Sequence, residues 1–151
     1  MVEQDGISPS QIALEITDGV MLRDVEKSLQ WLTAVNGIGF RVYLDDFGTG
    51  YSSLSYPKMF PVNTLKADKS FVQDMQEGNN EHTLVGAIIA MGHSLGLDIV
   101  AEGVELKSHV TALQHMGCQY VQGYYYSRPL PAEEFSAAVT RVTALLAESS
   151  H

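Results

Sequence analysis

Short apolar runs alternate along the chain with stretches in which apolar residues recur every three or four positions. The runs predict five buried strands, at Ile12–Thr17, Phe40–Asp46, Thr64–Asp68, Asp98–Gly103 and Tyr120–Tyr124. The periodic stretches predict helices through Leu22–Leu32, Leu84–Leu95 and Leu106–Met116, a short helical region near Leu54, and a final helix that Pro131 opens. Because strand and helix patterns alternate, we expect parallel strands with the helices outside.

A glycine ends each of three predicted helices, at Gly37, Gly96 and Gly117. The short turns that follow are typical of a parallel sheet wrapped by helices. A closed βα barrel, however, needs eight strands and about 250 residues, whereas this chain has 151 residues and its predicted strands begin close to residue 1. The pattern leaves two folds open: an open five-stranded sheet, or the C-terminal part of a barrel whose first strands are absent.

Each predicted strand ends with charged or amide side chains. The carboxyl ends of parallel strands lie on one rim of the sheet, where α/β folds build their catalytic sites. Carboxylates that meet there without matching cations imply a positive partner, most simply a divalent metal ion. The candidates, in strand order, are Glu15 and Asp18, Asp45 and Asp46, Lys66 and Asp68, Glu102 and Glu105, and finally Gln122.

The adjacent acids Asp45 and Asp46 belong to the most specific run. Neighbouring side chains of a regular strand point to opposite faces, so both acids face the rim only where the strand already turns. That arrangement suits one acid on each of two metal ions, or a metal ligand beside an acid that supports it. Gly48 and Gly50 allow the next loop conformations that are closed to other residues. The alternative is an acid pair that caps the next helix, and Glu15 alone is equally a cap.

Lys66 and Asp68 are two residues apart, so both project to the same side of their strand. A lysine that faces a barrel interior needs an anionic partner, either a phosphate or the carboxylates; the alternative is an edge lysine that extends to solvent. Glu102 suits a base that accepts a proton from a metal-bound water, and Glu105 suits a residue that holds a neighbouring loop. Acids at a helix N-terminus are the alternative for both. Gln122 can donate or accept a hydrogen bond toward water or ligand.

Composition narrows the class of protein. Hydrophobic residues make up 45% and charged residues 18%, an ordinary globular balance, and a formal charge of −9 argues against a protein that wraps duplex nucleic acid. A small anionic ligand remains compatible, because a bound metal inverts the local field. The longest apolar stretch, near Leu84–Met91, is too short to cross a bilayer, and the N-terminus does not resemble a signal peptide. With Cys118 as the only cysteine, we expect a cytoplasmic protein without a disulfide or membrane contact.

Together these runs resemble the EAL family of cyclic-di-GMP phosphodiesterases. The matching segments are Leu14–Thr17, Asp45–Tyr56, Pro61–Lys66, Asp68–Val72, Ala101–Glu105, Val121–Tyr124 and Arg128–Pro131. They cover nearly the whole chain, so we expect residues 1–147 to form the C-terminal part of an EAL-type domain and residues 148–151 to form a frayed tail. The resemblance implies a partial TIM-type (β/α) barrel, an α/β fold with about five parallel strands and helices outside.

Members of the family hydrolyse cyclic-di-GMP to linear pGpG with Mg²⁺ or Mn²⁺, and the resemblance implies a role for each rim residue. Glu15 and Asp45 would be metal ligands, and Asp46 would serve a second metal ion. Glu102 would be the general base, while Lys66 would orient the water or the phosphate. Supporting roles would fall to Asp68 beside Lys66, Glu105 and Asp18 around the Gly-rich loop, and Gln122 by the metal-bound water. Two metal ions can clamp an in-line displacement at phosphorus and generate its nucleophile.

The chain departs from the family pattern at three places. The Glu-Ala-Leu segment that names the family, and an Asn-bearing strand after it, each supply a metal ligand and are absent. Asp18 stands where the family usually has the longer Glu. Weak Mg²⁺ binding is expected, because Mg²⁺ requires near-octahedral coordination. We expect cyclic-di-GMP hydrolysis by the parent domain; the alternative is an inactive module that binds cyclic-di-GMP or dimerises. A homo-oligomer is expected to cover the open side of the barrel.

Overall fold

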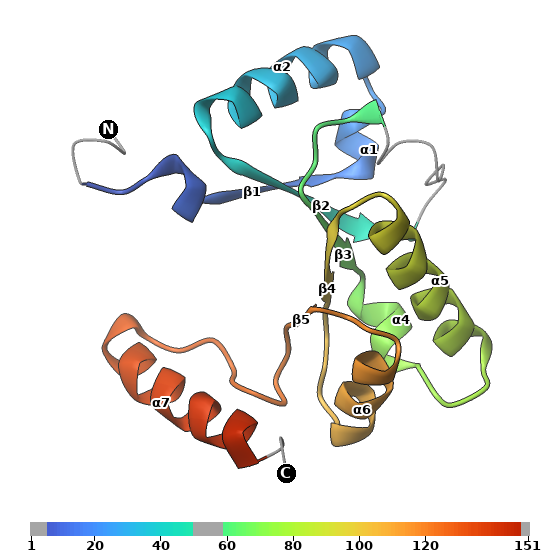
Figure 1. The fold of residues 1–151 in the computed structure, drawn as a ribbon, viewed down its shortest axis with the longest axis vertical. Coiled ribbons are helices and arrows are strands. Elements are labelled where there is room, and N and C mark those ends of the chain that lie inside the picture. Colours follow the sequence, from blue (N-terminus) through green and yellow to red (C-terminus); the bar gives the residue numbers. More distant parts are fainter. Residues whose placement is uncertain (1–5, 50–58, 149–151) are drawn as a thin grey trace.

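The computed structural model describes residues 6–49 and 59–148, and a five-stranded parallel sheet forms its centre (Figure 1). The strands follow each other in sequence order: β1 (Ala13–Thr17), β2 (Arg41–Phe47), β3 (Thr64–Ala67), β4 (Asp98–Ala101) and β5 (Tyr120–Val121). The helical elements are η2 (Pro9–Gln11), α1 (Asp18–Met21), α2 (Val25–Ile38), α4 (Lys69–Gln73), α5 (Asn80–Ser94), α6 (Lys107–His115) and α7 (Ala132–Glu148). The predicted arrangement of five parallel strands with helices outside is confirmed.

The β1–β2, β3–β4 and β4–β5 pairs each keep a continuous register. Leu14 lies opposite Val42, and Leu65 lies opposite Ile99, so that strand ends meet along one rim. The β2–β3 pairing shifts between Leu44 and Phe47, at the two adjacent acids. Such an irregularity bends a strand and redirects its side chains.

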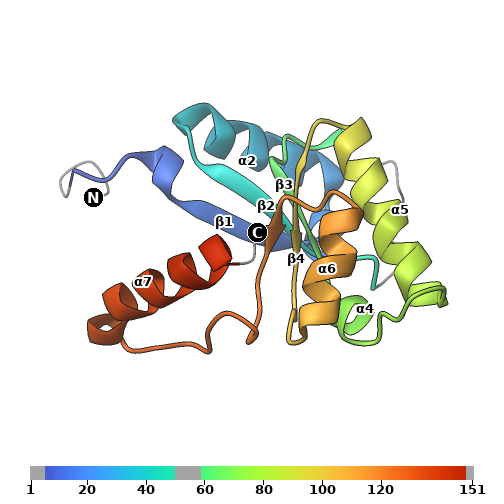
Figure 2. The same ribbon diagram turned by 60° about the horizontal axis from the view of Figure 1, so that its bottom comes forward.

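The hydrophobic core lies between the sheet and the helices on its outer face (Figure 2). Leu44, Leu65 and Ile99 are fully buried on three successive strands. Helix α5 lies close against β4 at Gly92, where an added Cβ would come within 1.9 Å of Ile99 Cδ1. Its start is capped by Asn79, whose side chain accepts a hydrogen bond from the backbone of His82 at 2.8 Å.

Helix α2 ends two residues later than its sequence suggests. We expected Asn36-Gly37 to close the helix, but it continues through Ile38, and Gly39 at φ 103° forms the cap. The Gly39 backbone N–H donates to the carbonyls of Asn36 and Val35. Both glycines are plausible ends in sequence, and only Gly39 takes the left-handed conformation that turns the chain toward β2.

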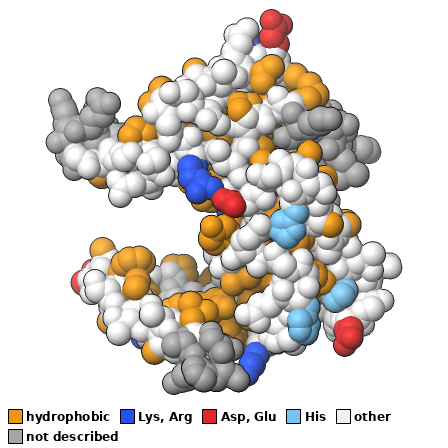
Figure 3. All heavy atoms as spheres, viewed as in Figure 1, with side chains coloured by type: hydrophobic (Ala, Val, Ile, Leu, Met, Phe, Trp, Pro, Cys, Tyr) orange, Lys and Arg blue, Asp and Glu red, His pale blue; other side chains and the backbone are white. Residues whose placement is uncertain are grey.

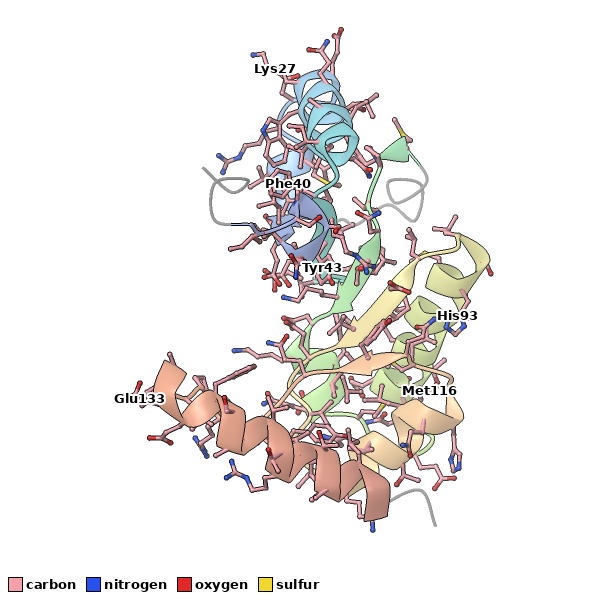
Figure 4. All side chains as sticks on the ribbon, turned by 60° about the vertical axis from the view of Figure 1, so that its left-hand side comes forward. Lys27, Phe40, Tyr43, His93, Met116 and Glu133 are labelled. Carbon is pink, nitrogen blue, oxygen red and sulfur yellow. The ribbon has the colours of Figure 1, made fainter. Side chains whose placement is uncertain are left out.

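The final helix, α7, lies apart from the other helices, across a hollow that opens on the inner face of the sheet (Figures 1 and 3). Figure 4 shows Glu133 near the outer end of this helix, far from Met116 beside α6. Ala138 is buried on α7, whereas Phe135 is 64% exposed. Apolar side chains of this helix such as Phe135 and Val139 are therefore exposed.

No helix in the described ranges is long and apolar enough to cross a membrane.

Candidate functional site

Lys66 on β3 is the centre of a cluster of charged side chains at the rim. Its side chain is only 5% exposed, and its Nζ lies 2.9 Å from Glu15 Oε1, 3.1 Å from Asp45 Oδ1 and 2.8 Å from Glu102 Oε1. These acids come from β1, from β2 and from the residue that follows β4. The parallel register thus brings together four residues that the sequence singled out.

Buried lysines usually lose their proton more readily, yet the opposite holds here. Burial lowers the pKa of Lys66, but hydrogen bonds to Glu102, Glu15 and Asp45 outweigh that effect and raise the pKa above its ordinary value of 10.5. The lysine is therefore charged at neutral pH. One ammonium group among three carboxylates leaves an excess of negative charge at this rim.

Asp46 and Asp68 form the next layer of acids. Asp46 has φ 55°, the only positive φ of a non-glycine residue in the described ranges, and its backbone carbonyl accepts a hydrogen bond from Thr49 Oγ1 at 2.9 Å. Burial and the nearby charges of Asp45 and Asp68 raise the pKa of Asp46. The strand therefore turns at this residue while it still pairs with β3.

Asp68 caps the short helix α4. Its Oδ1 accepts a hydrogen bond from the backbone of Ser70 at 2.9 Å and another from the Ser70 hydroxyl. Burial raises the pKa of Asp68. The two hydrogen bonds from Ser70 and the one with Asp46 lower this pKa by more than burial raises it, so the net shift is downward. The cap explains why Asp68 stays ionised beside other acids.

The other predicted residues lie at the edge of this cluster. Glu105 Oε1 accepts a hydrogen bond from Gln73 Nε2 at 2.8 Å, so α4 holds this acid in place. Gln122 is exposed and lines a cavity together with Glu102 and Glu105. Asp18 begins α1, but its side chain lies outside the described residues, as does the helical region expected near Leu54.

Sequence reasoning missed how closely the β4 and β5 exits approach each other. A Cβ on Gly123 would lie 2.1 Å from the carbonyl oxygen of Val104, so only glycine fits there without a backbone shift. The backbone of Tyr125 then donates to the same Val104 carbonyl at 2.9 Å. The signal in the sequence is a glycine directly after Gln122. Lys69 and Arg128, which also line the cavity, gave no such signal.

The donor types at this rim fit a divalent metal ion. Carboxylate oxygens are the ligands that Mg²⁺ and Mn²⁺ prefer, and Asp45 Oδ1 is buried with no hydrogen-bond partner in the described ranges beyond its ion pair with Lys66. The carboxylates converge on Lys66, however. Within the described residues, no three His, Cys, Asp or Glu side chains are placed to hold an ion together.

Comparison with known proteins identifies relatives of this chain. Residues 1–129 match the EAL domain family. The chain is 41% identical over 133 residues to the bifunctional diguanylate cyclase/cyclic di-GMP phosphodiesterase MucR of Pseudomonas aeruginosa, covering 88% of this chain and 19% of MucR. The curated relatives that it matches are much longer, and the chain spans only 16% to 21% of their lengths.

Solved structures of EAL proteins share its fold. The EAL domain of Mycobacterium smegmatis DcpA is 37% identical with a TM-score of 0.85, and the match covers 93% of this chain and 63% of that one. The manganese/cyclic-di-GMP complex of Klebsiella pneumoniae BlrP1 is 30% identical with a TM-score of 0.79, covering 85% of this chain and 33% of that one. The resemblance predicted from the rim residues is thereby confirmed: the chain belongs to the EAL domain family.

Proposed function

We propose that this chain supplies part of the catalytic site of an EAL domain that hydrolyses cyclic-di-GMP to linear pGpG. The observation that carries the proposal is the convergence of Glu15, Asp45 and Glu102 on Lys66 at the carboxyl ends of their strands. The manganese/cyclic-di-GMP complex of BlrP1, a related protein, supports the choice of ligand and of a divalent ion.

Glu15 and Asp45 would hold one divalent ion, Mg²⁺ or Mn²⁺, and Asp46 would contribute to a second. When bound, such ions neutralise the phosphodiester and lower the pKa of a coordinated water. The turn at Asp46 supports the assignment of Asp45 and Asp46 to different ions. With φ 55° at Asp46, the two neighbouring carboxylates do not follow the side-chain directions of a regular strand.

Glu102 would accept the proton of the attacking water. Its Oε1 lies 2.8 Å from Lys66 Nζ, so the lysine fixes the orientation of the carboxylate, and its side chain is mostly buried at 16% exposure. Lys66 would also attract a phosphate oxygen, since its ammonium is charged at neutral pH. Asp68 would hold α4 in place beside this pair through its cap on Ser70.

Incubation of the chain with cyclic-di-GMP and Mn²⁺ tests the proposal. We expect slow formation of linear pGpG, because no three His, Cys, Asp or Glu side chains among the described residues are placed to hold an ion together. Glu102→Gln keeps the shape of the side chain and removes the base, so it should reduce the rate at least about 100-fold. Glu133→Gln on α7 is the matched control and should leave the rate unchanged. Equal rates for the two variants would contradict the role of Glu102.

A second candidate function is a non-catalytic module that binds cyclic-di-GMP or self-associates. A groove at the β5 edge favours it: about 530 Å³ lies between α6, β5 and α7, and none of the described residues that line it is charged. In a chain of net charge −9, such a surface is where two copies meet with least repulsion. Binding of cyclic-di-GMP without turnover, lost in Lys66→Ala, would favour this function over catalysis.

For self-association we propose that β1 of one copy lies along the β5 edge of its partner. Both strands are edges of the sheet, and β1 carries Leu14 and Ile16 on one face, which the partner's α7 would help to cover. A two-fold arrangement forms this contact twice and leaves neither edge open. A molar mass that doubles from 16.5 kDa with rising concentration would support it.

A further inference from the structure

A cavity of about 430 Å³ adjoins the Lys66 cluster and shares Glu102 with it. Its other walls come from α4, from the β5 exit and from the loop that leads to α7, which contribute Lys69, Gln122, Tyr124 and Arg128. A ligand whose phosphate lies at Glu102 therefore extends into this space. None of the catalytic roles proposed above uses Tyr124 or Arg128.

Two positively charged residues, Lys69 and Arg128, line this cavity in a chain that is acidic overall. The sequence has nine Lys and Arg residues against eighteen Asp and Glu residues. Neither Lys69 nor Arg128 forms an ion pair within the described ranges. Two of the acids nearby are already engaged, Glu102 by Lys66 and Glu105 by Gln73. The cations are therefore available to an electron-rich ligand.

The guanidinium of Arg128 is already oriented. Its Cζ lies 4.5 Å from the centroid of the Tyr124 ring, a distance at which a cation and a ring face attract each other. The backbone on both sides of Tyr124 is held in turn, because Gly123 lies close against the Val104 backbone and the Tyr125 N–H donates to the Val104 carbonyl. An arginine fixed on an aromatic ring loses less conformational freedom when it binds a ligand.

We infer that Arg128, positioned by Tyr124, reads the guanine base of the dinucleotide and selects guanine over adenine. Guanine presents two acceptors on one edge, O6 and N7, which match the paired N–H donors of a guanidinium. Adenine presents N7 beside an amino group, and arginine has no acceptor to offer that amino group. The inference rests on the proposed cyclic-di-GMP function, and it adds a residue that determines specificity.

Isothermal titration calorimetry of the chain with cyclic-di-GMP and with cyclic-di-AMP tests the inference, with recovered ligand checked for hydrolysis. We expect the wild-type chain to prefer cyclic-di-GMP. Arg128→Ala should weaken cyclic-di-GMP binding about 10- to 100-fold while changing cyclic-di-AMP binding less than about twofold. Tyr124→Leu should weaken cyclic-di-GMP binding about two- to fivefold through loss of the ring.

Arg141→Ala on α7 is the matched control, because it removes the same charge from an exposed position far along the chain. It should leave both affinities unchanged. Arg128→Lys separates charge from geometry: retained affinity with lost selectivity supports guanine recognition. Equal weakening of both dinucleotides by Arg128→Ala would indicate a phosphate contact and overturn the inference.

These outcomes are distinct from those that concern catalysis. Selective binding without hydrolysis would leave the inference standing and favour the non-catalytic function over catalysis by this chain. Hydrolysis with unchanged selectivity in Arg128→Ala would remove the inference and leave catalysis standing. Absence of any cyclic-di-GMP binding by the wild-type chain would overturn both.

Discussion

The ammonium of Lys66 is almost fully buried and holds three carboxylates, so its removal affects stability as well as chemistry. Lys66→Met keeps the length of the side chain and leaves the acids without a counter-charge. We expect a loss of about 2 kcal/mol in the free energy of unfolding at pH 7, below the range for fully buried pairs because Glu15 is half exposed. Urea denaturation measures this loss.

The pH dependence of that loss follows from the raised pKa of Lys66. A raised pKa means that the contribution of the lysine is complete below its ordinary value of 10.5 and declines only as the pH rises through the folded-state value. The difference between the two proteins should therefore be constant from pH 7 up to the ordinary value of 10.5 and shrink only at higher pH. Lys69→Met is the control and should change stability by less than about 0.5 kcal/mol.

Asp46 is a residue whose charge opposes folding. Burial and the charges of Asp45 and Asp68 raise its pKa, so the folded state prefers the protonated form and loses stability as the pH rises past the ordinary value of 3.8. Asp46→Asn should therefore stabilise the chain at pH 7, by at most about 0.5 kcal/mol because water screens this site. Asparagine also tolerates the positive φ of this position.

Thermal unfolding at pH 7 and at pH 3 tests this prediction. The gain should be present at pH 7 and nearly absent at pH 3, where aspartic acid is neutral as well. A loss of stability at pH 7 would show that the carboxylate makes a favourable contact in the folded state.

At this scale the sequence predicted the acids and Lys66 at the rim, because the carboxyl ends of parallel strands lie on one rim of the sheet. It did not predict the contact of Arg128 with Tyr124. These residues lie in an irregular segment, where side-chain spacing carries no information about direction. The same limit applies to Gln73, whose hydrogen bond to Glu105 joins residues 32 positions apart.

At the scale of elements, the contact between α5 and β4 depends on Gly92. An added Cβ would lie 1.9 Å from Ile99 Cδ1 and 2.9 Å from Ile99 Cγ1. We expect Gly92→Ala to cost about 1–3 kcal/mol of unfolding free energy through overpacking, despite the better helix propensity of alanine. Chemical denaturation at neutral pH measures the cost.

The helix provides its own control. A Cβ on Gly86 would meet its nearest atom, Met116 Sδ, at an ordinary 3.9 Å. Gly86→Ala should therefore stabilise the chain by about 0.5–1 kcal/mol. Ile99→Val removes the Cδ1 that clashes, so in combination with Gly92→Ala it should restore part of the loss. Simple additivity of the two substitutions would contradict the proposed contact.

The existence and order of the strands were predicted more accurately than the residues at which the strands end. Predicted β1 and β2 begin within one residue of their observed starts, whereas the β5 run was predicted through Tyr124 and the strand ends at Val121. The strand ends before the apolar run does, because the backbone at Gly123 lies close against Val104. This is a tertiary contact, which the local sequence pattern does not contain. On α5 the buried face is Val85, Ile88, Ile89 and Gly92, whereas Leu84, the first apolar residue of the predicted helix, is exposed.

At the scale of the molecule, α7 shows what a sequence pattern leaves out. Its apolar residues recur at helical spacing, which predicts burial, yet Phe135 and Val139 are exposed in the structure. The helical spacing of apolar residues predicts that one face of α7 packs against another surface. It does not predict whether that surface belongs to the same chain. The match to the EAL domain of DcpA covers 63% of that chain, so the solved domain contains elements that have no counterpart in the match.

If the partner is a second copy, association must overcome repulsion between two chains of charge −9. Added salt should therefore strengthen self-association, because the screening length falls from about 10 Å at 0.1 M to about 3 Å at 1 M. Val139→Lys introduces a charge on the exposed apolar face of α7 and should abolish the dimer. Thr140→Lys, one residue along on the polar face, adds the same charge and should leave the dimer intact or strengthen it. Sedimentation equilibrium of the two variants at low and high salt separates a contact through α7 from general electrostatics, because only the contact distinguishes Val139 from Thr140.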